Sequence, residues 1–287
     1  GFVAISDDGS PVTNLSLKRR ALDYSKALGI TVISHADDRF LAGDGVMNEG
    51  ALSTRLGLAG IPNAAEEAMV ARDIMLAELT EGRLHLAHLS TKGSVQLVRA
   101  AKKQGLKNIT AEVTPHHLIL TDEAVAGYNT NAKTSPPLRS ASDAAALIEG
   151  LRDGTIDCIA TDHAPHAVVE KDVEFNKAAN GIIGLETAFS LIYGLVEKGS
   201  LNLTEAVRAM TINPAKVLDM DRGALRVGSA ADITIVDPKR PWTVEPEKLK
   251  SKSKNTPFTG WKFSSRVVMT IVNGKIVYDI LRSFRGF

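Results

Sequence analysis

The sequence predicts an α/β protein built on a (β/α)8 TIM barrel and followed by a small β-sandwich appendage. Short apolar runs rich in β-branched residues alternate along the chain with longer segments of helical periodicity. This alternation is typical of parallel strands joined by crossover helices. Each apolar run also ends in a polar or ionisable side chain, and in barrels the C-terminal ends of the strands carry the chemistry. No Gly-x-Gly-x-x-Gly turn follows the first run, as a doubly wound sheet would favour.

The elements of the barrel follow in order. We expect strands at 3–5, 30–33, 84–89, 108–113 and 157–160. We expect helices at 15–28, 64–79, 94–104, 142–152, 184–198 and 204–217. In the first helix, Leu17, Ala21, Leu22 and residues 24–27 are expected to form the apolar face.

The pattern changes after residue 220. We assign residues 1–220 to the barrel and 221–287 to the β appendage, with antiparallel strands expected within 223–237 and 267–278. Asn273-Gly274 lies between two β-rich runs and predicts a hairpin turn. Residues 246–260 are rich in Lys, Ser and Pro without a period, which indicates a surface loop.

The number of strands is smaller than a closed barrel needs. Five strand–helix units are visible where a barrel has eight, and the chain begins inside a strand at Gly1. The chain therefore looks like the back two-thirds of a longer barrel, and the family resemblance given below implies that these are strands 4–8, with an N-terminal part missing.

Composition excludes several classes of function. The 34 Lys and Arg side chains balance 33 Asp and Glu side chains, which leaves no basic field for nucleic acid. No run of about 18 uncharged apolar residues predicts a membrane span, and no secretory signal is visible. A single cysteine, Cys158, excludes an internal disulfide and favours a cytoplasmic location.

Histidines and carboxylates at strand ends predict a metal centre. None of the seven histidines follows His166. His35, His88 and Asp162 end separate predicted strands, so a barrel would bring them to one face. Two imidazoles and a carboxylate suit a zinc-type ion with an open position for water. Asp8 could add a second carboxylate and bridge two metals, and a bound water would then be activated as a nucleophile.

Several of these side chains also have a structural explanation. His35 could cap the loop that follows it. We expect His85 to be structural or packed against a helix, because its odd spacing from His88 places the two on opposite faces of a strand. His116 and His117 follow a strand end beside a proline, where loop packing is expected.

Two further positions are expected to be structural. Only one of Asp7 and Asp8 can face the axis, and we expect the other to cap the turn at Gly9. Cys158 lies within an apolar strand and is expected to be an inert buried thiol.

The block Thr161-Asp-His-Ala-Pro-His166, with residues 156–160 before it, resembles the signature of the dihydroorotases, which belong to the amidohydrolase superfamily of metal-dependent barrels. The resemblance covers essentially the whole chain. It extends through residues 6–9, 34–38, 88–91, 131–139, 181–187, 211–215 and 228–234.

The resemblance implies roles for the metal-binding positions. His35 and His88 match the ligands of one metal, and Asp162 matches a ligand of the other that also acts as general base and acid. Asp8 resembles the aspartate that bridges the metals in the long, type I bacterial enzymes. Hydantoinases and other dihydroorotases carry a carboxylated lysine there, so Asp8 argues against them.

The resemblance also implies substrate contacts. Asn131 and His166 match residues that bind the substrate ring and its carboxylate, and Gly181 matches one that contacts the substrate through its backbone. One departure stands out, because no His-x-His with a following arginine occurs in this sequence. In the family those residues hold the first metal and bind the substrate carboxylate, so we expect this chain alone to be inactive.

The function implied is reversible, zinc-dependent hydrolysis of dihydroorotate to N-carbamoyl-aspartate in pyrimidine biosynthesis, with one or two Zn²⁺ per active site. The partners expected are that small-molecule substrate and, from the resemblance, a second copy of the chain or aspartate transcarbamoylase. Two alternatives remain open: another cyclic amidohydrolase such as an allantoinase or hydantoinase, or an inactive scaffold bound to aspartate transcarbamoylase.

Overall fold

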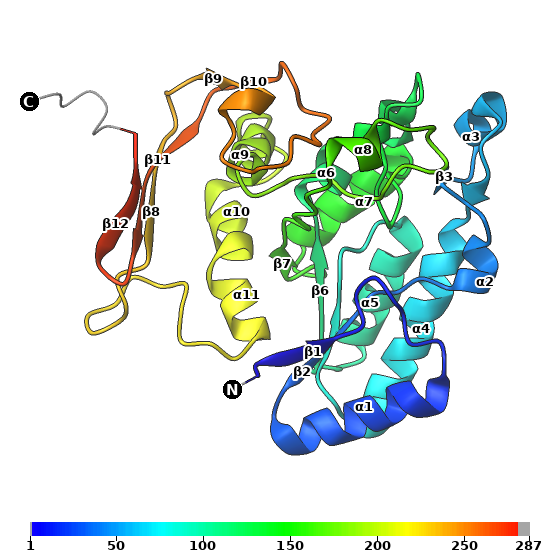
Figure 1. Ribbon diagram of the computed structural model, residues 1–287. Helices are drawn as coiled ribbons and strands as arrows, with labels where there is room; N and C mark the ends of the chain where they lie inside the picture. Colours follow the sequence, from blue (N-terminus) through cyan, green and yellow to red (C-terminus); the bar gives the residue numbers. More distant parts are fainter. Residues whose placement is uncertain (1, 281–287) are drawn as a thin grey trace, which may run out of the picture.

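A parallel sheet forms the centre of the protein. The computed structural model describes residues 2–280 (Figure 1). All neighbouring strands in this sheet run parallel, in the order β1-β2-β5-β6-β7. The strands are β1 (Ala4–Ser6), β2 (Thr31–Ser34), β5 (Leu84–Leu86), β6 (Ile109–Val113) and β7 (Cys158–Ile159). These are the five predicted strands, in the predicted order.

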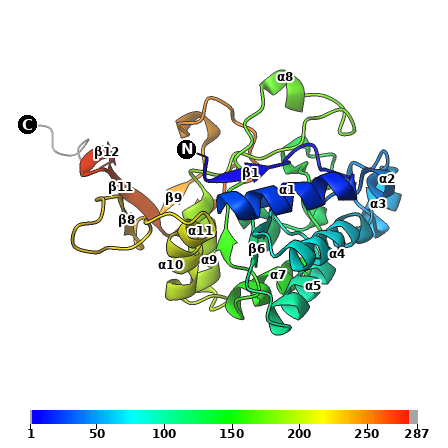
Figure 2. The same cartoon turned by 90° about the horizontal axis from the view of Figure 1, so that it is seen from below.

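Helices cover one face of the sheet. Four of them follow the sheet in turn, and Figure 2 shows them side by side. They are α1 (Leu15–Leu28), α4 (Asn63–Thr80), α5 (Lys92–Lys103) and α7 (Ala141–Arg152). Each agrees with a predicted helix to within two residues. The α/β prediction is confirmed, and the curved parallel sheet is consistent with a TIM barrel.

Alternation along β6 separates the core from the inner face of the sheet. Ile109, Ala111 and Val113 are buried and belong to the main apolar core beneath the helices. Thr110 and Glu112 alternate with them and therefore point to the opposite face. The face away from the helices thus carries polar side chains.

The predicted apolar face of α1 is wrong. The buried residues are Lys18, Leu22 and Ser25, while Leu17 and Tyr24 are exposed. These three buried residues are spaced i, i+4, i+7 and so lie on one face of the helix. Lys18 can be buried there because charged partners surround its ammonium group, as described below.

The predicted helix at 204–217 is two helices. They are α10 (Leu203–Met210) and α11 (Ile212–Val217), and they meet at Thr211. Pro214 explains the break, because its ring lacks an N–H and clashes with the carbonyl four residues earlier, that of Met210. The predicted helix at 184–198 is the shorter α9 (Ala188–Glu197).

Antiparallel strands follow in the C-terminal region. Strands β8 (Ile233–Asp237), β11 (Arg266–Val272) and β12 (Lys275–Asp279) form a sheet in the order β12-β11-β8. Asn273 and Gly274 have φ values of 47° and 75° and form the predicted hairpin turn. The predicted strand at 223–237 is confirmed only over β8. The end of the predicted appendage, 281–287, lies outside the described residues.

The segment 246–260 is a loop, as its composition predicts, but four of its side chains, Leu249, Asn255, Thr256 and Phe258, are buried. It holds one 3₁₀ turn, η3 (Pro246–Lys248), between β9 (Trp242–Thr243) and β10 (Lys262–Phe263). Leu249 and Phe258 are buried and share an apolar cluster with Ile182, Ile183 and Leu191. The segment therefore anchors itself to the barrel through two apolar side chains.

Short elements complete the loops at the C-terminal ends of the strands. They are α2 (Arg39–Ala42), β3 (Met47–Asn48), α3 (Ala51–Leu56), β4 (Gly60–Ile61), α6 (Pro115–Ile119), η1 (Asp122–Val125), η2 (Thr130–Ala132) and α8 (Val168–Lys171). Among the described residues, no helix has both the length and the apolar character that crossing a bilayer requires.

Candidate functional site

The predicted metal ligands lie just beyond the C-terminal ends of the strands. Asp8 follows β1, His35 follows β2 directly, His88 follows β5, and Asp162 follows β7. In a parallel sheet these ends meet at one edge, so four segments distant in sequence converge there.

Three of these side chains come together. The Nδ1 atom of His35 lies 2.8 Å from Nε2 of His88, and their rings pack edge to face. The Oδ1 atom of Asp8 lies 3.2 Å from the same His35 nitrogen and 3.6 Å from the same His88 nitrogen. Both imidazoles are buried, whereas the Asp8 side chain is 58% exposed. The carboxylate therefore approaches the pair from the open side.

This donor set fits a divalent metal ion. Two imidazole nitrogens and a carboxylate oxygen lie within 4.8 Å of one another, and this is a zinc-type ligand set. Hydrogen bonds from His35 and His88 hold the pKa of Asp8 well below its usual range. Burial acts to lower the pKa of His88, but the hydrogen bond to Asp8 and nearby carboxylates outweigh it and raise that pKa. A metal cation bound between the His35 and His88 nitrogens and the Asp8 carboxylate would replace the proton that these three groups share in hydrogen bonds.

Asp162 stands beside this group rather than within it. The three-residue cluster does not include its carboxylate, but Asp162 interacts electrostatically with His88, Asp8 and His35. Burial, together with the charges of Asp8 and Glu112, raises the pKa of Asp162. The residue has φ of 46°, and His88 has φ of 35°, so both leave their strands through the left-handed region, which is unusual for residues other than glycine.

A buried lysine supports the first two ligands. Lys18 Nζ, on α1, donates to Asp7 Oδ2 at 2.7 Å and to Ser34 Oγ at 2.8 Å, and lies 3.6 Å from Asp73 Oδ2. Asp7 Oδ1 in turn accepts a hydrogen bond from the backbone N–H of His35 at 2.9 Å. The predicted turn-capping role of Asp7 is thus incomplete. Asp7 does accept from Val12 N, but it also links Lys18 to the metal-ligand segment.

A second buried network holds the segment after His88. Glu66, on α4, accepts hydrogen bonds from the backbone N–H groups of Ser90 and Thr91 and from both hydroxyls. Arg139 donates to Ser90 Oγ at 3.1 Å and to Ile61 O at 2.6 Å. All four side chains are buried, so the peptide that follows His88 is fixed on several sides.

The predicted substrate contacts Asn131 and His166 line one cavity. The cavity measures about 210 Å³ and is also lined by Lys171, Lys254 and Asn255. The Nε2 atom of His166 lies 2.7 Å from the Asn180 carbonyl oxygen. Asp172 lines the same cavity, and the ammonium groups of the two lysines donate to backbone carbonyl oxygens, Lys171 to Ala179 and Gly181 and Lys254 to Leu249 and Ser251.

Gly181 lies directly beside His166. It has φ of 144°, and a Cβ atom there would approach Ala164 Cβ to 2.6 Å and His166 Cδ2 to 3.0 Å. Only glycine fits this position. Its N–H donates to Lys133 O at 2.8 Å, and its carbonyl accepts from Lys171 Nζ and Asn255 Nδ2, so the protein itself uses both backbone polar groups.

His85 is structural, but it does not pack against a helix. Its Nδ1 lies 2.8 Å from Thr110 Oγ1 and its Nε2 lies 3.0 Å from Glu112 Oε2, both on the inner face of β6. Cys158 completes a buried group with His85 and Glu112. Burial, and then the charges of Glu112 and Asp157, raise the pKa of the Cys158 thiol, which agrees with an inert thiol.

His116 and His117 lie on the short helix α6 rather than in a loop. Nε2 of His117 donates to Pro136 O at 3.1 Å, and its Nδ1 lies 2.7 Å from Thr114 Oγ1. Burial, and then the charge of His88, lower its pKa to about 3. His116 is also buried, and its Nε2 has no hydrogen-bond partner.

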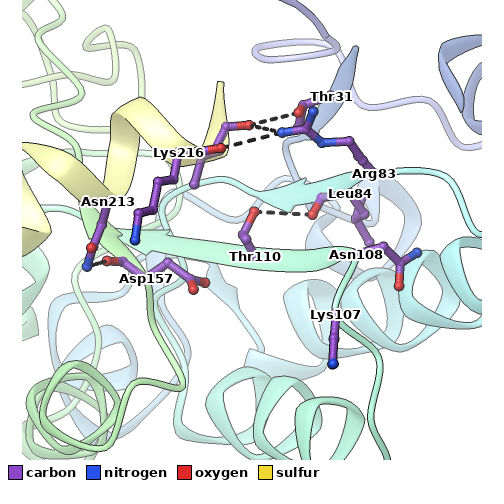
Figure 3. Close-up of a pocket in the computed structure, with 10 residues that line it drawn as sticks. Thr31, Arg83, Leu84, Lys107, Asn108, Thr110, Asp157, Asn213 and Lys216 are labelled. Atoms are coloured by element: carbon purple, nitrogen blue, oxygen red, sulfur yellow. Dashed lines mark hydrogen bonds between the residues drawn. The ribbon is translucent and has the colours of Figure 1, made fainter. Parts of the chain in front are cut away.

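A larger hollow lies at the opposite end of the sheet. It measures about 600 Å³ and is lined by residues at or before the strand starts, including Thr31, Leu84, Asn108 and Asp157 (Figure 3). None of the predicted site residues lines it, so the larger cavity and the candidate site are separate.

The residues that the sequence analysis missed are the buried polar supports Lys18, Glu66, Arg139 and Asn255. Of these four, only Lys18 could be found from the sequence, because its spacing from Leu22 and Ser25 puts the three residues on the same face of α1. The others lie far in sequence from the groups that they hold.

Comparisons with known proteins agree with this geometry. The family model "Amidohydrolase family" matches residues 2–277. A dihydroorotase of Geobacter metallireducens is 60% identical over 97% of this chain, and one of Syntrophus aciditrophicus is 55% identical over the same share. This chain spans 65% of the length of each of these relatives.

Solved structures give the same fold. An L-hydantoinase (dihydropyrimidinase) from Arthrobacter aurescens superposes with a TM-score of 0.86 at 27% sequence identity, covering 97% of this chain and 65% of that one. A D-hydantoinase from Thermus sp. superposes with a TM-score of 0.83 at 25% identity, covering 96% and 63%.

Proposed function

Because this chain belongs to the amidohydrolase family, we propose that it carries the metal-ligating and acid–base residues of a dihydroorotase. The observation that carries the proposal is the convergence of Asp8, His35 and His88 at the C-terminal ends of three parallel strands. Identity of 55–60% to dihydroorotases, against 27% to the hydantoinase, favours dihydroorotate over hydantoin as the substrate.

The residues of the site suit hydrolysis of a cyclic amide. His35, His88, Asp8 and Asp162 would hold one or two zinc ions. A zinc ion bound there supplies Lewis-acid chemistry, which activates water and polarises a carbonyl. Asp162 accepts the proton of the attacking water and delivers it to the ring nitrogen as the C–N bond breaks, which gives the ring-opened carbamoyl acid. Its raised pKa suits a group that must hold this proton between the two steps.

We assign the cavity that Asn131 and His166 line to the rest of the substrate. Asn131, Asn255 and His166 line it together with Lys171, Lys254 and Asp172, so it offers amide and imidazole groups that can hydrogen-bond to a polar ring. We assign the substrate carboxylate and ring to Asn131 and His166, with Gly181 shaping the wall between them.

Replacement of the acid–base residue tests the proposal. Asp162→Asn in the complete protein should lower kcat for dihydroorotate by at least about 100-fold while substrate binding persists. Asp157→Asn is the matched control, because Asp157 precedes the same strand at its other end, where it pairs with Lys102. Retained turnover in Asp162→Asn would refute the role. A panel of dihydroorotate, hydantoin and allantoin tests the substrate.

We also propose zinc as the metal, a place in pyrimidine biosynthesis, and a cytoplasmic location. As partners we propose a second copy of the protein or aspartate transcarbamoylase. Gel filtration of the protein with and without that enzyme would show either complex by its larger size. We further propose that residues 1–220 form the barrel part and that the antiparallel sheet beyond 221 forms part of a β-sandwich. Zinc content without turnover in the complete protein would favour an inactive scaffold instead.

A further inference from the structure

Asn255 joins three segments that lie far apart in sequence. Its Nδ2 donates to Ala164 O at 2.9 Å and to Gly181 O at 3.1 Å, and its Oδ1 accepts from His166 N at 3.2 Å. Its own backbone carbonyl accepts from Ile183 N at 3.0 Å. The residue is 4% exposed, so these bonds form away from water and each is costly to break.

The chemistry of the side chain matches its partners. A primary amide offers two N–H donors and one carbonyl acceptor, and here both donors meet carbonyl oxygens while the acceptor meets an N–H. An aspartate at this position would place its negative charge against two carbonyl oxygens. An alanine would remove the link altogether.

The segment that carries Asn255 comes from the C-terminal region of the chain. Figure 1 shows it (orange) at the same end of the molecule as α6 and α8. Burial of Leu249 and Phe258 against Ile182 anchors it there. Asn255 and Lys254 then reach the cavity that Asn131 and His166 line.

We propose that Asn255 is a positioning residue that fixes His166 against Gly181 and so sets the shape of the substrate cavity. The inference rests on the proposed function, because it assumes that His166 and this cavity meet the substrate. The proposal gives a role to Asn255, which lies about 75 to 90 residues after Ala164, His166 and Gly181, the residues to which it hydrogen-bonds. A displacement of about 1 Å at such a contact costs up to about 100-fold in rate.

A matched pair of variants tests the proposal in the complete protein. Asn255→Ala should raise KM for dihydroorotate about tenfold or more, with a smaller change in kcat and unchanged zinc content. Asn108→Ala is the control, because Asn108 Nδ2 also donates to two backbone carbonyls, those of Ala77 and Gly82, but at the opposite end of the sheet (Figure 3). It should lose stability without a change in KM. Equal KM values for the two variants would overturn the proposal.

Two further variants separate positioning from general support. The double variant Asn255→Ala/His166→Ala should be no worse than His166→Ala alone, because Asn255 acts through His166. Asn255→Asp keeps the shape and the acceptor but loses both donors, so its KM should rise as in Asn255→Ala. Full additivity in the first case, or a normal KM in the second, would contradict the role.

Hydrogen exchange supplies a readout that needs no substrate. The amide of His166 donates to Asn255 Oδ1, so it should exchange faster in Asn255→Ala and at the normal rate in Asn108→Ala. If the unmodified protein does not hydrolyse dihydroorotate, the proposed function fails, and exchange at His166 still decides whether Asn255 positions it. Unchanged exchange in both variants would overturn the inference.

Discussion

Replacement of Lys18 by methionine gives the most direct test of how the proposed metal ligands are supported. The ammonium group is buried between Asp7, at 2.7 Å, and Asp73, at 3.6 Å, and donates to Ser34. Methionine keeps the volume of the aliphatic stem and removes only the charge and its hydrogen bonds. We expect Lys18→Met to leave the carboxylates of Asp7 and Asp73 with a single cation, Arg72, which pairs with Asp73.

The expected loss of unfolding free energy depends on the contacts that Asp7 and Asp73 keep in Lys18→Met. Removal of one partner from a buried ion pair costs about 3–5 kcal/mol of unfolding free energy. Asp73 keeps two hydrogen bonds from Arg72, and Asp7 keeps the backbone N–H groups of Val12 and His35. These remaining contacts place the loss near the lower end, at about 3 kcal/mol.

Urea denaturation measures this loss, and a zinc titration measures its consequence. Because Asp7 holds the backbone of His35, weaker support should lower zinc affinity by about 10–100-fold. Lys26→Met is the control, since Lys26 lies on the same helix and pairs with Glu81 at 2.6 Å, but on the exposed surface. Lys26→Met should change neither the unfolding free energy nor the zinc affinity measurably. A Lys18→Met protein as stable as Lys26→Met would refute the reasoning.

Four further predictions follow from described contacts. The pKa of His117 falls from 6.5 to about 3 on folding, so the unfolded chain binds the proton first and the unfolding free energy should fall by about 2 kcal/mol between pH 7 and 5. Urea titrations should show this dependence weakened in His117→Gln. The Cys158 thiol should react with Ellman's reagent only as fast as the protein unfolds, and rapid reaction of the folded protein would contradict its burial. Gly274→Ala, at φ of 75°, should cost about 1–2 kcal/mol in a thermal melt because of the left-handed turn. Asp8→Asn should weaken zinc binding more than tenfold by calorimetry, and normal affinity would exclude Asp8 as a ligand.

Local sequence patterns predict most of the strands and helices of the barrel. The strand β6 alternates buried apolar residues with Thr110 and Glu112, and α1 begins and ends at the residues that its sequence predicts, with Asn14 and Gly29 as caps. The ends of the strands then place Asp8, His35 and His88 together without any knowledge of the loops. Periodicity and strand polarity are local properties, so a single sequence reports them well.

Long-range contacts account for the errors. Composition predicts a loop at 246–260 that lies wholly on the surface, because nothing within that segment shows that Phe258 joins an apolar cluster with Ile182. Likewise, Leu17 and Tyr24 are apolar yet exposed, while Lys18 is charged yet buried, since the partners of Lys18 come from β1, β2 and α4. The buried amide of Asn255 belongs to the same class. Its role depends on three segments that only the fold brings together.

The left-handed backbone at His88 and Asp162 has a consequence for engineering this protein. At both positions glycine would relieve about 1 kcal/mol or more of backbone strain, yet both side chains belong to the proposed chemistry. A library selected only for thermal resistance would therefore accumulate glycine at these two positions and lose turnover as its melting temperature rose. Selection schemes for this chain need a catalytic readout from the first round.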